Sequence, residues 1–145
     1  MNELKGEIQP ACLPSKPVEV GRNCFVSGWG TGSRGKLSAL KIRIKDCDYA
    51  YDPNIPSPDN EDFFCAISRV GSGCHGDSGG PMICEENDQV VLYGAVSTGE
   101  DYFGCGSNFD NIYANIYQHI ELIETVLVRP LFSTDLNKCS DSMIY

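Results

Sequence analysis

The sequence lacks several features that mark common classes of protein. No two of its eight cysteines form a C-x-x-C pair, and only two histidines are present. A zinc site is therefore not expected, and no metal or other cofactor is predicted. No stretch approaches the roughly 18 apolar residues of a membrane-spanning helix. Residues 1–30 contain no charged start followed by an apolar run, so they show no export signal.

Positive charge is also scarce. Eleven Lys and Arg residues face twenty Asp and Glu residues, which gives a net charge of −9. The acids gather in stretches that are expected to be loops, at 46–52, 59–62, 85–88 and 100–101. Such a surface argues against nucleic acid or a membrane as a partner. The alternative is that the acidic surface serves solubility and nothing more.

Cysteine, in contrast, is abundant. Eight cysteines in 145 residues favour a disulfide framework in an oxidising compartment, so we expect a secreted, extracellular protein. Because no export signal is visible, a missing N-terminal part is expected. Eight cysteines permit about a hundred pairings, and spacing alone does not choose among them.

The first half of the chain indicates β-structure. Residues 1–23 hold three prolines and are predicted to run extended over a surface. Residues 24–32 combine a short β-run with a glycine cluster around Trp29, which predicts a strand that turns sharply over a buried ring. Residues 40–45 alternate apolar and basic side chains, as a half-buried strand does. Residues 48–62 hold three more prolines and are predicted to be a surface loop.

The second half continues the β-pattern and ends in a helix. Residues 63–66, 82–84 and 90–96 are predicted strands, and an acidic turn at 85–88 joins the last two. Apolar residues from Ile116 to Leu127 follow helical spacing, and Pro130 ends it. One amphipathic C-terminal helix is therefore predicted.

The stretch Cys74–Pro81 reads C-H-G-D-S-G-G-P. It places the hydroxyl of Ser78 among three glycines, which allow sharp turns and leave room for a substrate. A tight turn here could aim the NH groups of Gly76 and Ser78 at one spot, where they would stabilise an oxyanion. The alternative is a glycine-rich loop with an incidental serine. The motif resembles the nucleophile loop of the chymotrypsin-like serine proteases (trypsin family, S1).

The resemblance covers about residues 7–128 and implies a fold. It implies an all-β domain, a six-stranded antiparallel β-barrel like the second barrel of these proteases, with a C-terminal α-helix. Residues 1–128 would be a partial peptidase domain and residues 129–145 a tail. Ile8–Pro14 looks like the segment that joins the two barrels, and Gly94–Gly99 resembles the edge that pairs with substrate backbone.

The resemblance also implies roles around the nucleophile Ser78. Gly76 and Ser78 would supply the oxyanion hole. Asp77 would be the acid that pairs with a newly freed N-terminal amine in activated members, and without that amine the loop is expected to be zymogen-like. The alternative role of Asp77 is a turn-capping acid.

A serine nucleophile needs a base and a group that orients the base. In the family a histidine and an aspartate of the first barrel do this, and the chain is expected to begin after both. His75 is implied to line the substrate cleft, whereas His119 falls in the helix pattern and is expected at the surface or partly packed. No complete triad can be assembled from the sequence.

The implied substrate pocket is uncharged. Six positions carry it: Ser72, His75, Ser97, Thr98, Gly99 and Asn111. Ser72 at the floor supplies a hydroxyl where basic-specific members hold an aspartate, so Lys and Arg are disfavoured. We expect a shallow pocket for small or medium uncharged residues.

The resemblance chooses three disulfides: Cys24 with Cys84, Cys47 with Cys65, and Cys74 with Cys105. Cys12 and Cys139 are left over. In relatives a cysteine at the Cys12 position often ties the barrel to a light chain; alternatively, the tail brings Cys139 to it.

Two functional classes therefore compete. The first is half of a secreted serine endopeptidase, inactive alone, whose partners are a polypeptide substrate or inhibitor and a missing N-terminal barrel or light chain. The second is a non-catalytic homologue that binds a peptide or protein. The intact Ser78 and its glycines favour the first, because a binding module has little use for oxyanion donors.

Overall fold

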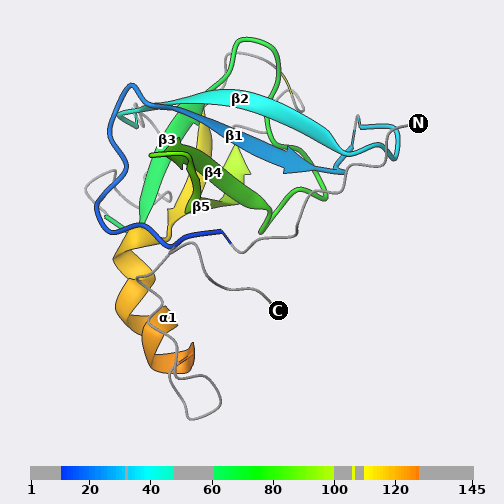
Figure 1. Ribbon diagram of the computed structural model, residues 1–145. Helices are drawn as coiled ribbons and strands as arrows, with labels where there is room; N and C mark the ends of the chain where they lie inside the picture. The colour runs from blue at the N-terminus through cyan, green and yellow to red at the C-terminus, as the bar shows by residue number, and fades with distance from the viewer. Residues whose placement is uncertain (1–10, 32, 48–60, 100–105, 107–109, 128–145) are drawn as a thin grey trace, which may run out of the picture.

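The structure is a computed structural model that describes residues 11–31, 33–47, 61–99, 106 and 110–127. Six antiparallel strands close into one barrel, and a helix projects away from it (Figure 1). Around the barrel the strands follow the order β1-β2-β3-β6-β5-β4. This confirms the predicted all-β fold, a six-stranded barrel that ends in one helix.

The elements have the following bounds. The strands are β1 Asn23–Gly28, β2 Ser38–Lys45, β3 Phe63–Ile67, β4 Pro81–Glu86, β5 Gln89–Gly99 and β6 Asn111–Asn115. A 3₁₀ turn, η1 Tyr117–His119, leads into α1 Ile120–Leu127.

The predicted alternation in β2 is confirmed. Ile42 and Ile44 are each 2% exposed, whereas Lys41 and Arg43, which alternate with them, face solvent. The apolar face of a strand with period two thus lies inside the barrel. Of the loop predicted at 48–62, residues 48–60 lie outside the described residues, as does the predicted tail at 129–145.

The β4–β5 hairpin is longer than predicted. Glu85 and Glu86 belong to β4, and only Asn87 and Asp88 form the turn. Both turn residues have positive φ, 48° and 63°, which is the backbone of a tight hairpin turn that matches the twist of its strands. Asn and Asp tolerate this conformation better than most residues. The stretch 85–88, predicted to be an acidic turn, is thus half strand, because its first two residues belong to β4.

The barrel interior is filled by aromatic and aliphatic side chains. Tyr93 and Tyr113 are fully buried, and the ring of Phe64 stacks on Tyr113 with centroids 5.6 Å apart. Gly94 makes this packing possible, because a Cβ there would lie 2.7 Å from Cζ of Phe64. The methyl of Met82 would lie 3.2 Å from the same Cβ. A side chain at position 94 would therefore force the core apart.

The prediction that Trp29 is buried was wrong. Its side chain is 66% exposed, just beyond the end of β1. The inward space is occupied by the carboxylate of Asp77, which lies directly against the backbone of Gly28 and Gly30. The two glycines therefore face inward and the indole between them faces solvent.

The described part of the N-terminal segment, residues 11–22, lies against β5 at Cys12, and residues 1–10 of the segment predicted to run extended lie outside the described residues. Cys12 pairs with Val91 of β5 in a parallel bridge. The Cys12 NH donates to the Val90 carbonyl at 2.8 Å, and the Leu92 NH donates to the Cys12 carbonyl at 2.9 Å. The segment thus occupies the side of β5 opposite to β4 at these residues.

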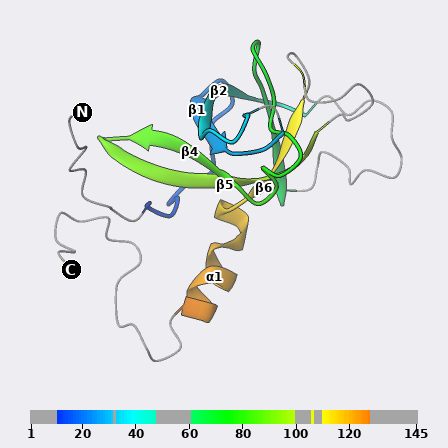
Figure 2. The same cartoon turned by 90° about the vertical axis from the view of Figure 1, so that its right-hand side faces the viewer.

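The predicted C-terminal helix is confirmed, although its first turn is 3₁₀. The Ile116 NH donates to the Tyr93 carbonyl at 3.0 Å, which fixes the start of the helical region on β5. From there α1 extends away from the barrel, as two views show (Figure 1, Figure 2). None of the described helices is long and apolar enough to cross a membrane.

One end of the barrel is held by a disulfide, and we call it the cystine end. It is defined by the Cys24–Cys84 bond between β1 and β4, whose Cα atoms are 4.4 Å apart. The opposite end of the same two strands carries the loop of Ser78, and we call it the serine end.

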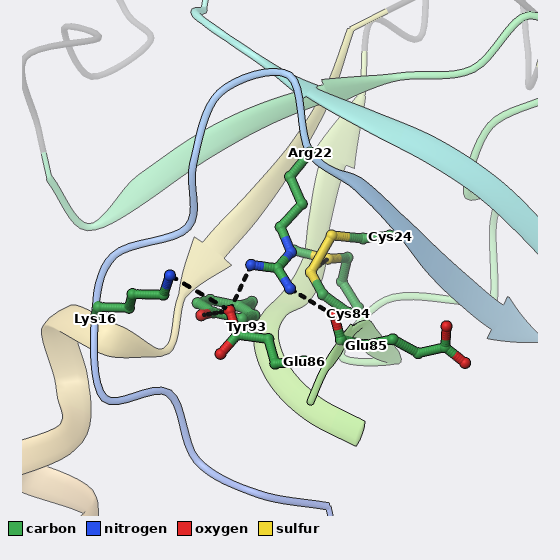
Figure 3. The surroundings of a disulfide bond; sticks show 8 residues. Lys16, Arg22, Cys24, Cys84, Glu85, Glu86 and Tyr93 are labelled. Carbon is green, nitrogen blue, oxygen red and sulfur yellow. Dashed lines mark hydrogen bonds and ion pairs between the residues drawn. A yellow bond between two sulfur atoms is a disulfide. The ribbon is translucent and has the colours of Figure 1, made fainter. Parts of the chain in front are cut away.

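An ionic cluster surrounds the disulfide of the cystine end (Figure 3). The Arg22 guanidinium pairs with the Glu86 carboxylate and donates to the Glu85 carbonyl. The Tyr93 hydroxyl donates to the same Glu86 carboxylate at 2.7 Å, and Lys16 Nζ lies 4.0 Å from it. The Arg22 guanidinium also lies over the Tyr93 ring, 5.7 Å from its centroid. The cluster ties the N-terminal segment to the β4–β5 hairpin.

Candidate active site

Ser78 lies on the loop between β3 and β4, at the serine end of the barrel. Ser78 and Gly76 are exposed, and Asp77 between them is partly buried. Gly76 and Gly79 adopt positive φ values of 95° and 77°, a conformation that favours glycine. The glycines of the motif therefore serve the turn, as the sequence predicted.

Backbone hydrogen bonds fix this loop on both sides of the serine. The Asp77 NH donates to the Cys74 carbonyl and the Gly80 NH to the Asp77 carbonyl, both at 2.8 Å. The Gly79 NH donates to the Val96 carbonyl of β5 at 2.8 Å. In contrast, the NH groups of Gly76 and Ser78 donate to no other group in the part of the chain that the structure describes. The two NH groups predicted to form an oxyanion hole are therefore not used in holding the described part of the loop.

The Asp77 carboxylate lies against the backbone just beyond the end of β1. Oδ1 accepts a hydrogen bond from the Gly30 NH at 2.8 Å, and Oδ2 accepts one from the Cys74 NH at 3.0 Å. A Cβ on Gly28 or Gly30 would lie 2.1 or 2.3 Å from a carboxylate oxygen. Only glycine therefore lets the carboxylate reach these donors.

The two histidines lie in different surroundings. The carbonyl of His75 accepts hydrogen bonds from the NH and the hydroxyl of Thr31, at 2.8 and 3.2 Å, while its side chain is exposed beside the serine loop. His119 lies on η1 with Nε2 4.0 Å from an oxygen of Asp62, and its side chain is 40% exposed. The expected surface position of His119 is thus observed. Neither histidine is shown to contact Ser78.

The predicted pocket positions converge beside the serine loop. Asn111, the first residue of β6, is 3% exposed and lies opposite Gly99 of β5. Its Oδ1 lies 3.9 Å from the place that a Cβ on Gly73 would take. The Ser72 hydroxyl accepts a hydrogen bond from the Gly106 NH at 3.1 Å. Ser72, Gly99 and Asn111 therefore border one region, although their role as a substrate pocket stays a prediction.

The remaining predicted wall lies on the end of β5. Ser97 is exposed there, and Thr98 pairs with Ile112 of β6 across a register shift after Val96. The side chain of Thr98 lies outside the described residues. A shift of register re-aims the strand end, a feature common beside active sites.

An ion pair that the sequence analysis missed lies next to this region. Lys45 Nζ contacts both oxygens of Asp110, at 2.9 and 3.1 Å, and the Asp110 side chain is only 14% exposed. The pair joins the end of β2 to the residue before Asn111. Because 65 residues separate Lys45 from Asp110, no local pattern could have indicated it.

Two of the three predicted disulfides are confirmed. Cys24 is bonded to Cys84, and Cys47 to Cys65 with Cα atoms 5.1 Å apart. Cys74 is also disulfide-bonded, but its predicted partner Cys105 lies outside the described residues. Among the residues that the structure describes, no three metal-ligating side chains gather to hold a metal.

Comparisons with known proteins agree with this geometry. The sequence profile of the family described as Trypsin matches residues 2–123. Mannan-binding lectin serine protease 1 of Rattus norvegicus is 36% identical over 135 residues, which cover 85% of this chain and 19% of the relative. Complement factor I of Mus musculus is 33% identical over 140 residues, covering 90% and 22%.

A third relative is similar in extent. The chain is 30% identical over 129 residues to a protein of Canis lupus familiaris named hepatocyte growth factor activator serine proteases, covering 81% of this chain and 19% of the relative. The chain thus spans about a fifth of the length of the curated relatives it matches. By its profile match, these relatives and its barrel, the chain belongs to the trypsin family of serine proteases.

Proposed function

We propose that this chain is the nucleophile-bearing part of a secreted serine endopeptidase, with residues 1–128 as part of the peptidase domain. Ser78 is the nucleophile, and the NH groups of Gly76 and Ser78 form the oxyanion hole. The observation that supports this most is the division of hydrogen bonds in the loop. Asp77, Gly79 and Gly80 use their NH groups to hold the loop, and the other two remain available.

The chemistry follows from these atoms. Ser78 Oγ attacks the carbonyl carbon of a peptide bond while its proton passes to a base, and the carbonyl oxygen takes up negative charge. The NH groups of Gly76 and Ser78 stabilise that charge, an effect worth about 3 kcal/mol per donor. The C–N bond then breaks, the amine takes the proton from the base, and water hydrolyses the resulting ester.

The base and its orienting acid are proposed to come from residues outside this chain. His119 is held beside Asp62 on η1. His75 belongs to the serine loop itself, and its carbonyl is tied to Thr31. The chain alone is therefore expected to cleave no peptide at a useful rate, because loss of base and orienter removes most of the rate enhancement.

Labelling with a fluorophosphonate probe tests this proposal. The purified chain should react no faster than its Ser78→Ala variant, and the longer product that carries a histidine and an aspartate of the first barrel should react at Ser78. Labelling of the chain alone that disappears in His75→Ala would make His75 the base. A longer product that fails to react, although it holds both groups, would favour the binding module.

We also propose that the pocket accepts small or medium uncharged side chains before the cut bond. The Ser72 hydroxyl and the Asn111 amide are neutral, and the adjacent acid, Asp110, already pairs with Lys45 through both of its oxygens. No carboxylate among these groups is left to offset the desolvation of a Lys or Arg side chain.

Cleavage of a peptide library by the activated longer product tests the pocket. Uncharged residues should dominate before the cut bond. The variant Ser72→Asp should shift the preference toward Lys and Arg, while Ser15→Asp at an exposed position of the N-terminal segment should not. A dominant Lys or Arg preference in the unchanged protein would contradict the proposal and leave the role of Ser78 intact.

A further inference from the structure

Lysine and arginine are unevenly distributed over this acidic chain. Eight of its eleven Lys and Arg residues lie in the part that the structure describes. Three of the eight, Lys16, Arg22 and Lys45, form ion pairs with acids. Within the described residues, the other five are exposed and form no ion pair: Arg34, Lys36, Lys41, Arg43 and Arg69.

The β1–β2 hairpin carries four of these five cations. Arg34 and Lys36 lie in the loop that joins the two strands, which run side by side (Figure 1). Lys41 and Arg43 lie on β2 itself. Because Ile42 between them is buried, both basic side chains point outward from the barrel.

Arg69 joins the same surface from the neighbouring strand. The antiparallel register of β2 and β3, continued by two residues, sets Arg69 opposite Lys41. The chain after β3 stays beside β2, because a Cβ on Gly71 would lie 3.7 Å from Leu40. Ser68 is 6% exposed, so the next residue points outward. We call the outward side of the β1–β2 hairpin, together with Arg69, the basic face.

Apolar side chains lie between these cations. Phe25 of β1 is directly opposite Lys41 and is 38% exposed. Trp29 and Leu37 follow the last pair of the β1–β2 ladder and are 66% and 59% exposed. Aromatic side chains and arginine are enriched where one polypeptide binds another. The basic face therefore combines positive charge with apolar contact area.

The basic face begins beside the serine loop. The Thr31 NH and hydroxyl both donate to the carbonyl of His75, three residues before Ser78. From there β2 extends toward the cystine end, and Ser38 to Arg43 spans about 16 Å at roughly 3.3 Å per residue. An extended peptide of about six residues covers that length.

We propose that the basic face docks a short acidic segment of the polypeptide that the complete protease cleaves, outside the residues at the cut bond. This proposal rests on the proposed function. Carboxylates of the segment pair with the cations, and its apolar side chains cover Phe25, Trp29 and Leu37. A sulfated polysaccharide suits the face less, because it gains little from exposed apolar side chains and a net charge of −9 repels a long polyanion.

Trp29 provides the readout, because it is the only tryptophan of the sequence and lies on the basic face. The probe is the capped peptide Glu-Leu-Glu-Phe-Glu-Leu-Glu, and its control carries Gln in place of every Glu. Titration of the full chain with the acidic peptide should shift the Trp29 emission to the blue, and added salt should weaken binding. The Gln peptide should bind about tenfold more weakly. No shift, or equal binding of the two peptides, would overturn the proposal.

Charge removal shows which cations bind the peptide. Lys41→Gln should weaken binding about threefold, and Lys41→Gln/Arg69→Gln about tenfold. Lys16→Gln removes the same charge from the N-terminal segment and should change binding by less than about twofold. Equal weakening in Lys16→Gln and Lys41→Gln would overturn the proposal. A heparin oligosaccharide that shifts the Trp29 emission when the acidic peptide does not would also overturn it, in favour of a polysaccharide.

The activated longer product separates this proposal from the proposed function. Attaching the acidic segment to a cleavable peptide should raise kcat/KM, mainly through KM, and Lys41→Gln should remove most of that gain. Cleavage that the segment does not improve would overturn its role in docking substrate. Binding of the probe by the chain, when the longer product cleaves neither peptide, would uphold the docking surface and contradict only the role of Ser78.

Discussion

The two ends of the barrel are held by different kinds of interaction. At the cystine end, a disulfide, an ion pair and a tyrosine hydrogen bond join the N-terminal segment to the β4–β5 hairpin. At the serine end, backbone hydrogen bonds and one carboxylate hold the loop against glycines, and the disulfide-bonded Cys74 lies four residues before Ser78. Strong side-chain links suit an end of the barrel at which no substrate has to bind. A loop held by its own backbone keeps a hydroxyl and two NH groups exposed to a substrate.

The largest loss of stability should appear when the disulfide of the cystine end is removed. The Cys24→Ser/Cys84→Ser variant opens a loop of 60 residues and should lose about 4 kcal/mol of unfolding free energy. The matched Cys47→Ser/Cys65→Ser variant opens one of 18 residues and should lose about 3 kcal/mol. Denaturant unfolding measures both. Equal losses would show that loop length does not set the stability of the cystine end.

At the serine end, one methyl group should have a large effect. Gly30→Ala places a Cβ 2.3 Å from the Asp77 carboxylate, so the loop must shift, at a cost of about 2 to 3 kcal/mol. Gly71→Ala is the control, because its Cβ would meet Leu40 at an ordinary 3.7 Å. Thermal unfolding of the two variants gives the comparison. If both lost the same stability, the close fit between Asp77 and Gly30 would not matter.

The ionic cluster should contribute less than the disulfide that it surrounds. Glu86→Gln weakens the acceptor of Arg22 and Tyr93 and should cost about 1 to 2 kcal/mol. Glu85→Gln should change stability by less than about 0.5 kcal/mol, because Arg22 contacts only the Glu85 carbonyl. Chemical denaturation in low and high salt would check this. A loss in Glu85→Gln equal to that in Glu86→Gln would contradict the assignment.

The smallest effect at neutral pH concerns the two buried tyrosines. Burial and the hydrogen bond to Glu86 raise the pKa of Tyr93, and burial alone raises the pKa of Tyr113. The folded state therefore favours the neutral phenols. Their contribution is complete below about pH 10, the ordinary tyrosine pKa, and is lost as the pH rises above it.

Phenylalanine variants separate the two tyrosines. Tyr93→Phe should cost about 1 kcal/mol at pH 7, because its hydroxyl donates to Glu86. The Tyr113 hydroxyl has no hydrogen-bond partner among the described residues, so Tyr113→Phe should be neutral or stabilising. Unfolding measured from pH 7 to pH 11 would also show a weaker alkaline loss in both variants. A large loss in Tyr113→Phe at pH 7 would reveal a partner for that hydroxyl.

The sequence indicated those features that short patterns carry. The alternation in β2 and the glycines around Ser78 follow from local geometry, and the resemblance supplied the two disulfides that the structure confirms. Contacts between distant residues were not predictable in this way. Trp29 was misplaced because the Gly-Trp-Gly pattern does not show that Asp77, 47 residues from Gly30, occupies the inward space. The pairs Arg22–Glu86 and Lys45–Asp110 were missed for the same reason.

The pairing of Cys12 with β5 affects the tendency of this protein to aggregate. β6 hydrogen-bonds to β5 only from Gly94 onward, so the first part of β5 would otherwise present an open strand edge. Open edges recruit strands from other molecules and start aggregation. Cys12 occupies that edge through the NH of Leu92 and the carbonyl of Val90. A fragment that begins at β1 would keep all six strands. It would still be prone to aggregate, because it would lack the residues around Cys12 that cover the open edge of β5.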